Sequence, residues 1–291
     1  MYGRRVLFLA LLSVSFSLHA QEKEQIEINT ALMMSTFKLQ GTGRTPPNST
    51  SMGTVFFLGK PSKSDPKVAH YVLVTAAHVL DDIAGDDATI ILRKNESQGI
   101  FTRFPYTFKI RNHGIDLYVR HPSTDVAAMY FIMPIKDPFV LLDVSVLSND
   151  SVLAHYEVHP GDELFCLGYP LGAEANDIGF PILRGGKIAS YPIVPTRLVK
   201  SILFDFAVFP GNSGGPVYFS YETRRFGGAM QMPLPGNYMA GVVGLVTQLR
   251  FVSFPIPNGA FIPTMANVPI QLGVIVPAAF IEETFGMLPE K

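Results

Sequence analysis

The stretch Gly211-Asn212-Ser213-Gly214-Gly215-Pro216 decides the fold of this 291-residue chain, because it places a serine between glycines. Glycine lets the backbone bend sharply and bring its N–H groups close to a bound group. A serine held in this way is suited to attack a carbonyl carbon, with nearby N–H groups to stabilise the oxyanion that forms. A plain glycine-rich hairpin turn has the same composition, so the rest of the chain must separate the two interpretations.

The positions of the histidines exclude one fold that this motif permits. Gly-x-Ser-x-Gly also describes the nucleophile turn of α/β-hydrolases, in which the catalytic histidine follows the serine. All seven histidines of this chain precede Ser213, so a base that activates the serine must lie upstream. The predicted strands also alternate with turns and not with long helices, which disfavours that fold.

Val74-Thr75-Ala76-Ala77-His78-Val79 supplies the best candidate for the base. The apolar run 70–74 predicts a strand, and the small alanines after it let the chain turn tightly. His78 would then emerge at the end of that strand, held by packed backbone. A histidine taken alone is more often a satisfied polar residue of the core, so the interpretation depends on the other motifs.

Asp125 supplies the third candidate, because it stands directly before the apolar run 126–132. Burying a bare carboxylate costs several kcal/mol, so a partner is needed. A buried histidine N–H is the kind of partner that would keep Asp125 ionised. A strand-starting Asp in a turn is the plain alternative. Asp116 and Asp143 are the rival carboxylates, and neither precedes such a compact apolar strand.

Short apolar segments separated by turn residues predict an all-β protein, and the chain has 25 Gly, 23 Pro and no Trp. The segments predicted as strands are 52–58, 70–75, 88–93, 126–132, 163–169, 181–190, 201–209, 216–220, 238–248 and 272–277. Only a turn after His78 and the segment 278–285 indicate helix. This spacing favours two packed barrels or a sandwich, with the crossing between the halves at 136–151.

Taken together, the motifs resemble the chymotrypsin-like (trypsin-like) serine proteases, whose catalytic residues follow in the order His, Asp, Ser. The resemblance is closest to the bacterial HtrA/DegP-like branch and covers about residues 30–285. Further segments that carry it are 52–57, 167–172, 185–190, 205–213 and 241–246.

The resemblance implies two six-stranded antiparallel β-barrels packed face to face, with the active site between them. Residues 21–143 would form an N-terminal arm and the first barrel, which carries His78 and Asp125. Residues 144–291 would form the second barrel, which carries Ser213, and a short C-terminal helix.

The resemblance also implies a serine endopeptidase that works through an acyl-enzyme. Ser213 would be the nucleophile, His78 its base, and Asp125 the residue that orients the imidazole. The backbone N–H groups of Gly211 and Ser213, with Asn212 between them, would form the oxyanion hole. Neither a cofactor nor a metal is expected.

Specificity is predicted by motif position within the family. Ala207 would lie near the floor of the primary pocket, and Gly244, Leu245 and Val246 would line its wall. None of these residues carries a charge. We therefore expect cleavage after small or medium aliphatic residues.

The chain also departs from the family pattern. HtrA-like enzymes usually carry a C-terminal PDZ domain, and none is expected here because the chain stops at Lys291. Asn212 stands where digestive enzymes have an Asp that pairs with a newly cut N-terminus, so activation by N-terminal insertion is not expected. The stretches 221–237 and 251–268 do not resemble strands. They are interpreted either as loops that wall a cleft for apolar peptide or as insertions with their own packing.

The N-terminus has the pattern of a signal peptide over residues 1–20. Arg4 and Arg5 precede the apolar run 6–12, and the small Ala20 precedes a polar stretch. A membrane anchor is the alternative, although the run is short for a spanning helix. The arginine pair also permits twin-arginine export in place of the general secretory route.

Composition narrows the location and the partners. Cys166 is the single cysteine, expected as a small core residue, so no intrachain disulfide forms. This favours a bacterial cell envelope, and the protein is expected to be secreted or periplasmic, with no stable membrane span after signal cleavage. With a net charge of −1 and no Lys/Arg run, nucleic acid is not an expected partner; proteins or peptides are.

Two other kinds of function remain open from the sequence. The first is a binding protein on a protease scaffold that no longer cuts, which the joint presence of all three side chains and the glycines disfavours. The second is an esterase or acyl-transfer enzyme of α/β type, which the lack of a histidine after Ser213 disfavours.

Overall fold

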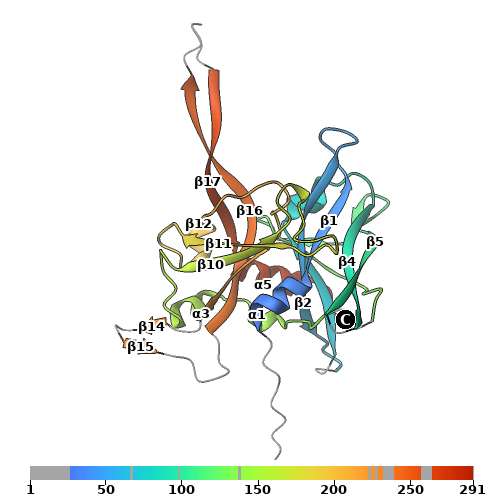
Figure 1. Cartoon of the computed structure of the whole chain (residues 1–291), viewed down its shortest axis with the longest axis horizontal. Coiled ribbons are helices and arrows are strands. Elements are labelled where there is room, and N and C mark those ends of the chain that lie inside the picture. Colours follow the sequence, from blue (N-terminus) through green and yellow to red (C-terminus); the bar gives the residue numbers. More distant parts are fainter. Residues whose placement is uncertain are drawn as a thin grey trace, which may run out of the picture.

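Strands dominate the structure, as the sequence predicts (Figure 1). The computed structural model describes residues 27–65, 68–97, 99–136, 139–221, 224–226, 229–231, 239–256 and 264–290. The predicted signal peptide, residues 1–20, lies outside these ranges. Within them, no helix combines the length and the apolar character that crossing a membrane requires.

The N-terminal half forms one antiparallel sheet of seven strands in the order β5-β4-β1-β2-β3-β9-β8. Their bounds are β1 Thr36–Thr42, β2 Thr50–Pro61, β3 Ala69–Thr75, β4 Asp87–Ser97, β5 Ile100–Lys109, β8 Val119–Arg120 and β9 Ala127–Tyr130. Next to them lie the short hairpin of β6 (Arg111–Asn112) with β7 (Ile115–Asp116) and the helices α1 (Ile28–Ser35) and α2 (Ala77–Asp81). The central strands β2 and β3 are continuously apolar and buried over 55–58 and 72–74, as expected where both faces of a sheet are covered.

The closed six-stranded barrel predicted for this half is not evident among the described residues, where the sheet has seven strands and no pairing joins its edge strands β5 and β8. Aromatic side chains lie between these edges, with Phe108 and Tyr106 packed on Phe131 at ring-centroid distances of 5.0 and 6.1 Å. They border a cavity of about 370 Å³ that Leu117 and Val119 also line.

The C-terminal half does close into a six-stranded antiparallel barrel, which confirms that part of the prediction. Its strands, in barrel order, are β10 Glu163–Gly168, β11 Ile182–Ile188, β12 Ile202–Asp205, β17 Thr264–Pro277, β16 Met239–Ile256 and β13 Pro216–Tyr221. The remaining elements are η1 Val144–Val146, α3 Asp150–His155, η2 Pro170–Gly172, α4 Thr196–Val199, β14 Arg224–Phe226, β15 Ala229–Gln231 and α5 Ala278–Met287. Cys166 is buried in this barrel as expected, and burial raises the pKa of its thiol to about 12.

The two halves share a hydrophobic core. The cluster that begins in the N-terminal sheet continues into the barrel through Leu167 and Tyr218. It also includes Phe280, Ile281 and Phe285 of α5, the helix that follows the last barrel strand. The C-terminal helix therefore packs on the N-terminal sheet, and this contact joins the two halves.

The segment 251–268 differs from its prediction. The structure extends β16 to Ile256 and begins β17 at Thr264, so that the two strands pair from Phe251↔Pro269 to Ile256↔Thr264. Prolines and the lack of alternating polar residues hide this hairpin in the sequence. The predicted strand 201–209 is shorter than expected, because β12 ends at Asp205 and the chain then forms the loop that leads to Ser213.

Candidate functional site

His78 lies in α2, the short helix that directly follows β3. Strand β3 is buried from Val72 to Thr75, the buried Ala76 caps the helix, and the buried Ala77 is its first residue. Only small side chains fit this tight connection between a central strand and a helix. The local sequence therefore places the imidazole at the end of β3, as the motif predicts.

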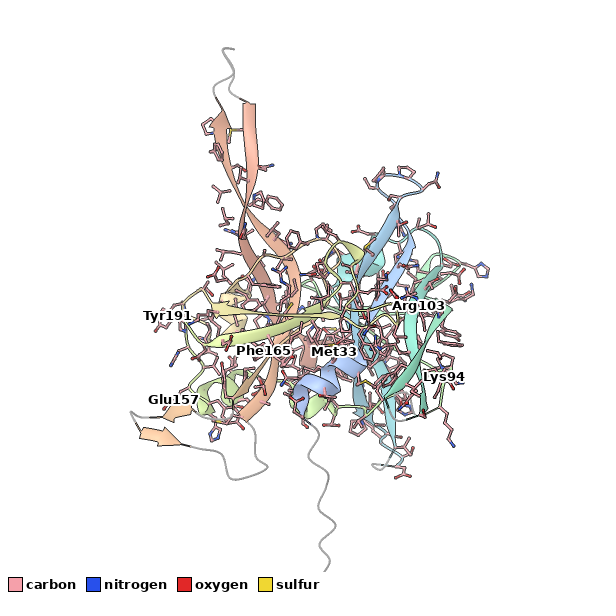
Figure 2. All side chains as sticks on the ribbon, in the orientation of Figure 1. Met33, Lys94, Arg103, Glu157, Phe165 and Tyr191 are labelled. Carbon is pink, nitrogen blue, oxygen red and sulfur yellow. The ribbon has the colours of Figure 1, made fainter. Side chains whose placement is uncertain are left out.

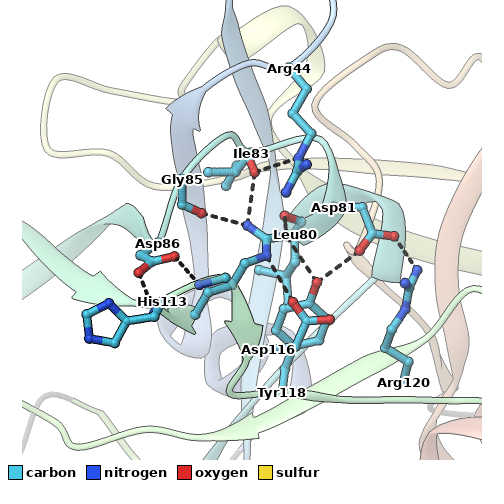
Figure 3. A network of polar contacts seen from close by, with 12 residues as sticks. Arg44, Leu80, Asp81, Ile83, Gly85, Asp86, His113, Asp116, Tyr118 and Arg120 are labelled. Carbon is cyan, nitrogen blue, oxygen red and sulfur yellow. Dashed lines mark hydrogen bonds and ion pairs between the residues drawn. The ribbon is translucent and has the colours of Figure 1, made fainter.

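The C-terminal end of α2 is held by the buried guanidinium of Arg111 (Figure 3). Arg111 donates from Nη2 to the Leu80 carbonyl at 2.7 Å and from Nη1 to the carbonyls of Ile83 and Gly85 at 3.0 and 2.9 Å. Its Nε donates to Asp116 Oδ1 at 2.9 Å. These bonds satisfy carbonyls that a helix end leaves open, and they fix the helix that carries His78.

Asp125 contacts His78 through both carboxylate oxygens. Its Oδ1 accepts the backbone N–H of His78 at 2.9 Å, and its Oδ2 lies 2.6 Å from Nδ1 of the ring. Both side chains are partly exposed. The rival carboxylates are engaged elsewhere: Asp116 binds Arg111, and Asp143 accepts the backbone N–H of Ser145.

The contact between His78 and Asp125 shifts the pKa of both groups. Burial acts to lower the pKa of His78, but the hydrogen bond and charge of Asp125, with the charges of Asp82 and Asp81, raise that pKa above its ordinary value. Burial acts to raise the pKa of Asp125, but its bonds to His78 and the backbone donors bring that pKa below its ordinary value. Asp125 therefore stays ionised near neutral pH. Nδ1 of His78 then carries a proton and donates it in a hydrogen bond to Asp125 Oδ2. The other ring nitrogen, Nε2, is left as a base.

Ser213 lies in the loop before β13 and is partly exposed. Its hydroxyl donates to the carbonyl of Thr247 in β16 at 3.1 Å. Among the described residues no hydrogen bond joins this hydroxyl to His78. Such bonds often tighten only when substrate is bound, and here the hydroxyl must first turn away from Thr247.

Thr54 of β2 attaches the serine loop to the N-terminal sheet. Its backbone N–H donates to the Ser213 carbonyl at 2.8 Å, and its Oγ1 donates to the Gly211 carbonyl at 2.6 Å. A Cβ on Gly214 would lie 2.1 Å from the Thr54 carbonyl and 3.1 Å from the Ala76 nitrogen, so the loop packs against the connection that leads to His78. Sequence reasoning missed this role of Thr54, although its position in the motif 52–57 was a usable signal.

The loop also presents unpaired backbone donors. Within the described part of the chain, no acceptor is found for the backbone N–H of Gly211 or for that of Ser213. The intervening Asn212 N–H is bound to the Phe209 carbonyl at 3.0 Å, and Asn212 itself is buried. Gly211 has a φ of +98°, and a Cβ there would lie 2.1 Å from the Tyr169 carbonyl, so no other residue fits without strain.

A buried arginine supports the segment that touches Gly211. Arg93 of β4 donates to the carbonyl of Gly179 at 2.7 Å, to that of Thr36 at 2.8 Å and to the Tyr169 hydroxyl at 3.3 Å. Its guanidinium lies between the rings of Phe37 and Phe180. Sequence reasoning missed Arg93, and the signal was a charged residue at the end of the apolar run 88–93.

Of the residues predicted to form the specificity pocket, some are accessible at the surface and others are buried. Ala207 is partly exposed. Leu245 and Val246 are 0% exposed and pack into the hydrophobic clusters, so their side chains do not line an open wall as predicted. Gly244 is buried against the Val276 backbone, where a Cβ would lie 2.0 Å from the carbonyl oxygen. These residues alternate between the two faces of a barrel strand, and each face is covered.

The described residues offer a hydroxyl and two N–H donors without a described acceptor in the serine loop, and an imidazole oriented by a carboxylate in the N-terminal half against which that loop packs. Within the described ranges, no group of three His, Cys, Asp or Glu side chains is placed to hold a metal ion.

Solved structures resemble this chain, whereas comparison at the level of sequence finds no relative. No known protein-family model matches the sequence, and no curated protein matches it. The structure aligns with the active form of the Rv3671c protease from M. tuberculosis at a TM-score of 0.47 and 16% sequence identity, over 91% of this chain and 85% of that chain. Similarity at this level does not assign a family or an activity to the chain.

Proposed function

We propose that the protein is a serine endopeptidase in which Ser213, His78 and Asp125 form the catalytic triad. The observation that carries the proposal is the two-point contact between Asp125 and His78 beside a serine loop that Thr54 attaches to the same sheet. A merely structural histidine would have no need of a neighbouring serine or of unpaired N–H groups. The triad geometry of serine hydrolases requires all of these features together.

In the first half of the reaction, Ser213 Oγ bonds to the scissile carbonyl carbon while its proton passes to Nε2 of His78. The carbonyl electron pair moves onto oxygen, and the N–H groups of Gly211 and Ser213 stabilise that oxyanion. One such donor typically contributes about 3 kcal/mol to lowering the barrier. The C–N bond then breaks as Nε2 protonates the leaving amine, which leaves an ester on Ser213.

In the second half, His78 takes a proton from water while the water oxygen bonds to the ester carbon. The ester C–O bond breaks, and the proton on Nε2 returns to Ser213 Oγ. Asp125 remains ionised throughout and stabilises the imidazolium that forms in each half. The three residues are thereby restored, one water molecule is consumed per bond cut, and the proposed reaction needs no cofactor.

A fluorophosphonate probe is expected to label this protein on Ser213, because the reagent forms a stable bond only with an activated serine hydroxyl. Mass spectrometry of the digested protein locates the adduct. His78→Ala should abolish labelling, whereas Ser145→Ala, which changes an exposed serine in η1, should leave it intact. A folded wild-type protein that stays unlabelled would support the alternative of a binding protein on a protease scaffold.

We also propose that the bond is cut after small or medium aliphatic residues, because Ala207 brings no charge to the position assigned to the pocket floor. A peptide library should show cleavage after Val or Ala at least about tenfold more efficiently than after Arg or Lys, which is about 1.4 kcal/mol of discrimination. Ala207→Asp should reverse this order by supplying a carboxylate for a basic side chain. Strong cleavage after Arg or Lys by the wild type would contradict the assignment.

A further inference from the structure

The hairpin formed by Phe251–Ile256 of β16 and Thr264–Ile270 of β17, here termed the arm, extends beyond the barrel (Figure 1). The barrel partner of β16 is β13, whose pairing ends at Leu245, and the partner of β17 is β12, whose pairing ends at Leu272. Beyond these points the two strands pair only with each other. Figure 2 shows the side chains of the arm standing apart from the body of the protein.

The arm is apolar and carries no charge. The sequence contains no Asp, Glu, Lys, Arg or His between Phe251 and Ile281. The large side chains of the arm remain about half exposed, at 53% for Phe251, 45% for both Val252 and Phe254, and 57% for Met265. A two-stranded ribbon has no second layer against which to bury such side chains. Apolar surface of this kind in a folded protein usually marks a binding site.

The outer edge of β16 is continuous with the candidate active site. Up to Val246 this edge is occupied, because Gly214 and Gly215 exchange backbone hydrogen bonds with Val246 at 2.7 and 2.9 Å. From Thr247 onward, no described residue forms a backbone hydrogen bond with this edge. Ser213 stands where the free edge begins, with its hydroxyl on the Thr247 carbonyl. An unpaired strand edge is a template for an added strand.

We infer that the arm binds the part of a substrate polypeptide that lies many residues before the bond to be cut. This inference rests on the proposed function and names the substrate chemistry: an extended, uncharged and mainly apolar segment. Such a segment adds antiparallel to β16, like every other strand pair of the barrel. Since β16 runs outward from Thr247, an antiparallel strand runs inward and delivers its C-terminal end to Ser213.

The length of the arm sets the reach of this site. From Thr247 to Ile256 the edge spans about 30 Å at about 3.3 Å per residue, so it passes well beyond the residues next to the scissile bond. Beyond the exposed Arg250, charged residues in that part of the substrate are disfavoured, because the arm offers them no partner and their hydration is lost. A lipid bilayer is a poorer occupant, since a two-stranded ribbon leaves backbone N–H and C=O groups that hydrocarbon cannot satisfy.

The test uses two peptides that are identical around the cut, with about four and about twelve residues before it, the added residues being apolar. The long peptide should have a kcat/KM at least about tenfold above that of the short one with the wild-type protein. The double substitution Val252→Thr with Phe254→Thr keeps good strand formers but removes apolar surface. It should reduce that gain to less than about threefold and leave the short peptide within about twofold of wild type.

Ser253→Thr is the matched control, because it changes the neighbouring position, which points to the opposite face of the arm, without removing apolar surface. It should preserve the advantage of the long peptide. Equal kcat/KM values for the two peptides with the wild type, or a double substitution that lowers both alike, would overturn the inference.

A binding measurement separates this inference from the proposed function. With Ser213→Ala, fluorescence anisotropy should show the long peptide bound at least about tenfold more tightly than the short one, and the double arm substitution should remove the difference. Equal binding would overturn the inference even where the wild type cuts both peptides. If the long peptide binds tightly but the wild-type protein never cuts it, the peptidase proposal is refuted and the inference about the arm stands. Arm-dependent dimers in light scattering, or arm-dependent sedimentation with phosphatidylglycerol vesicles, would reassign the surface to a second copy or to lipid.

Discussion

Ser213→Ala is expected to reduce peptide hydrolysis about a millionfold. The substitution removes the atom that would bond to the scissile carbonyl and leaves no other nucleophile at that position. It also removes the hydroxyl that binds the Thr247 carbonyl, a contact at a partly exposed site. The measurement is kcat on a defined peptide, with a detection limit set by the uncatalysed rate.

The fold of the Ser213→Ala variant should remain intact, because the backbone bond from Thr54 to the Ser213 carbonyl does not depend on the side chain. Circular dichroism and thermal unfolding check this. A variant that folds normally and retains a substantial fraction of the wild-type rate would show that another group performs the attack, and the triad assignment would fall.

Asp125→Asn is expected to reduce kcat by about four orders of magnitude, as the equivalent change does in other triads. The structure gives the reason. The backbone N–H of His78 donates to one oxygen of Asp125, so an asparagine must place its carbonyl there and turn its NH₂ group toward Nδ1. Nδ1 then accepts, the ring proton moves to Nε2, and Nε2 can no longer take the proton of Ser213.

The pH dependence provides a second readout of the same change. In the wild type, activity should be lost as pH falls through the pKa of His78, because only the neutral ring acts as a base, and Asp125 raises that pKa. Asp125→Asn removes the carboxylate that favours the charged ring, so the residual activity should persist to lower pH than in the wild type. Asp143→Asn, which changes a carboxylate bound to the Ser145 backbone, should leave both rate and profile near wild type. An acid limb that moves to higher pH in Asp125→Asn would contradict the proposed pairing.

Several parts of the structure could not be predicted, for identifiable reasons. Strand β5 alternates partly buried and exposed positions, but Pro105 and two charged residues mask its pattern. It forms an edge strand because β4 pairs with it along its length. Helix α1 is short, and Glu27 starts it by accepting the backbone N–H groups of Asn29 and Thr30. A helix of that length depends on packing more than on its own residues.

The supports of the candidate site were equally hidden. Thr54 and Arg93 act through contacts with residues far away in the chain, on Gly211 and Gly179 respectively. The sequence marks the positions of both residues, within the segment 52–57 and at the end of the run 88–93, but it does not identify the distant residues that they contact. Long-range hydrogen bonds of this kind exist only after the strands have paired.

The sequence by itself determined the residue types of the candidate site, their order, the upstream position of the base and the all-β class. Three local patterns carry this information: glycines around a serine, small residues before a histidine, and an aspartate before an apolar run. Each limits the backbone conformation or the burial of its own segment, whichever strands that segment later pairs with. Only the tertiary structure decided which of the three carboxylates contacts His78 and how the N-terminal sheet is arranged. It alone also placed the side chains of Leu245 and Val246 in the core and paired residues 251–270 as the arm. These outcomes depend on which distant strands pair and what covers each face, and local composition carries no information about either.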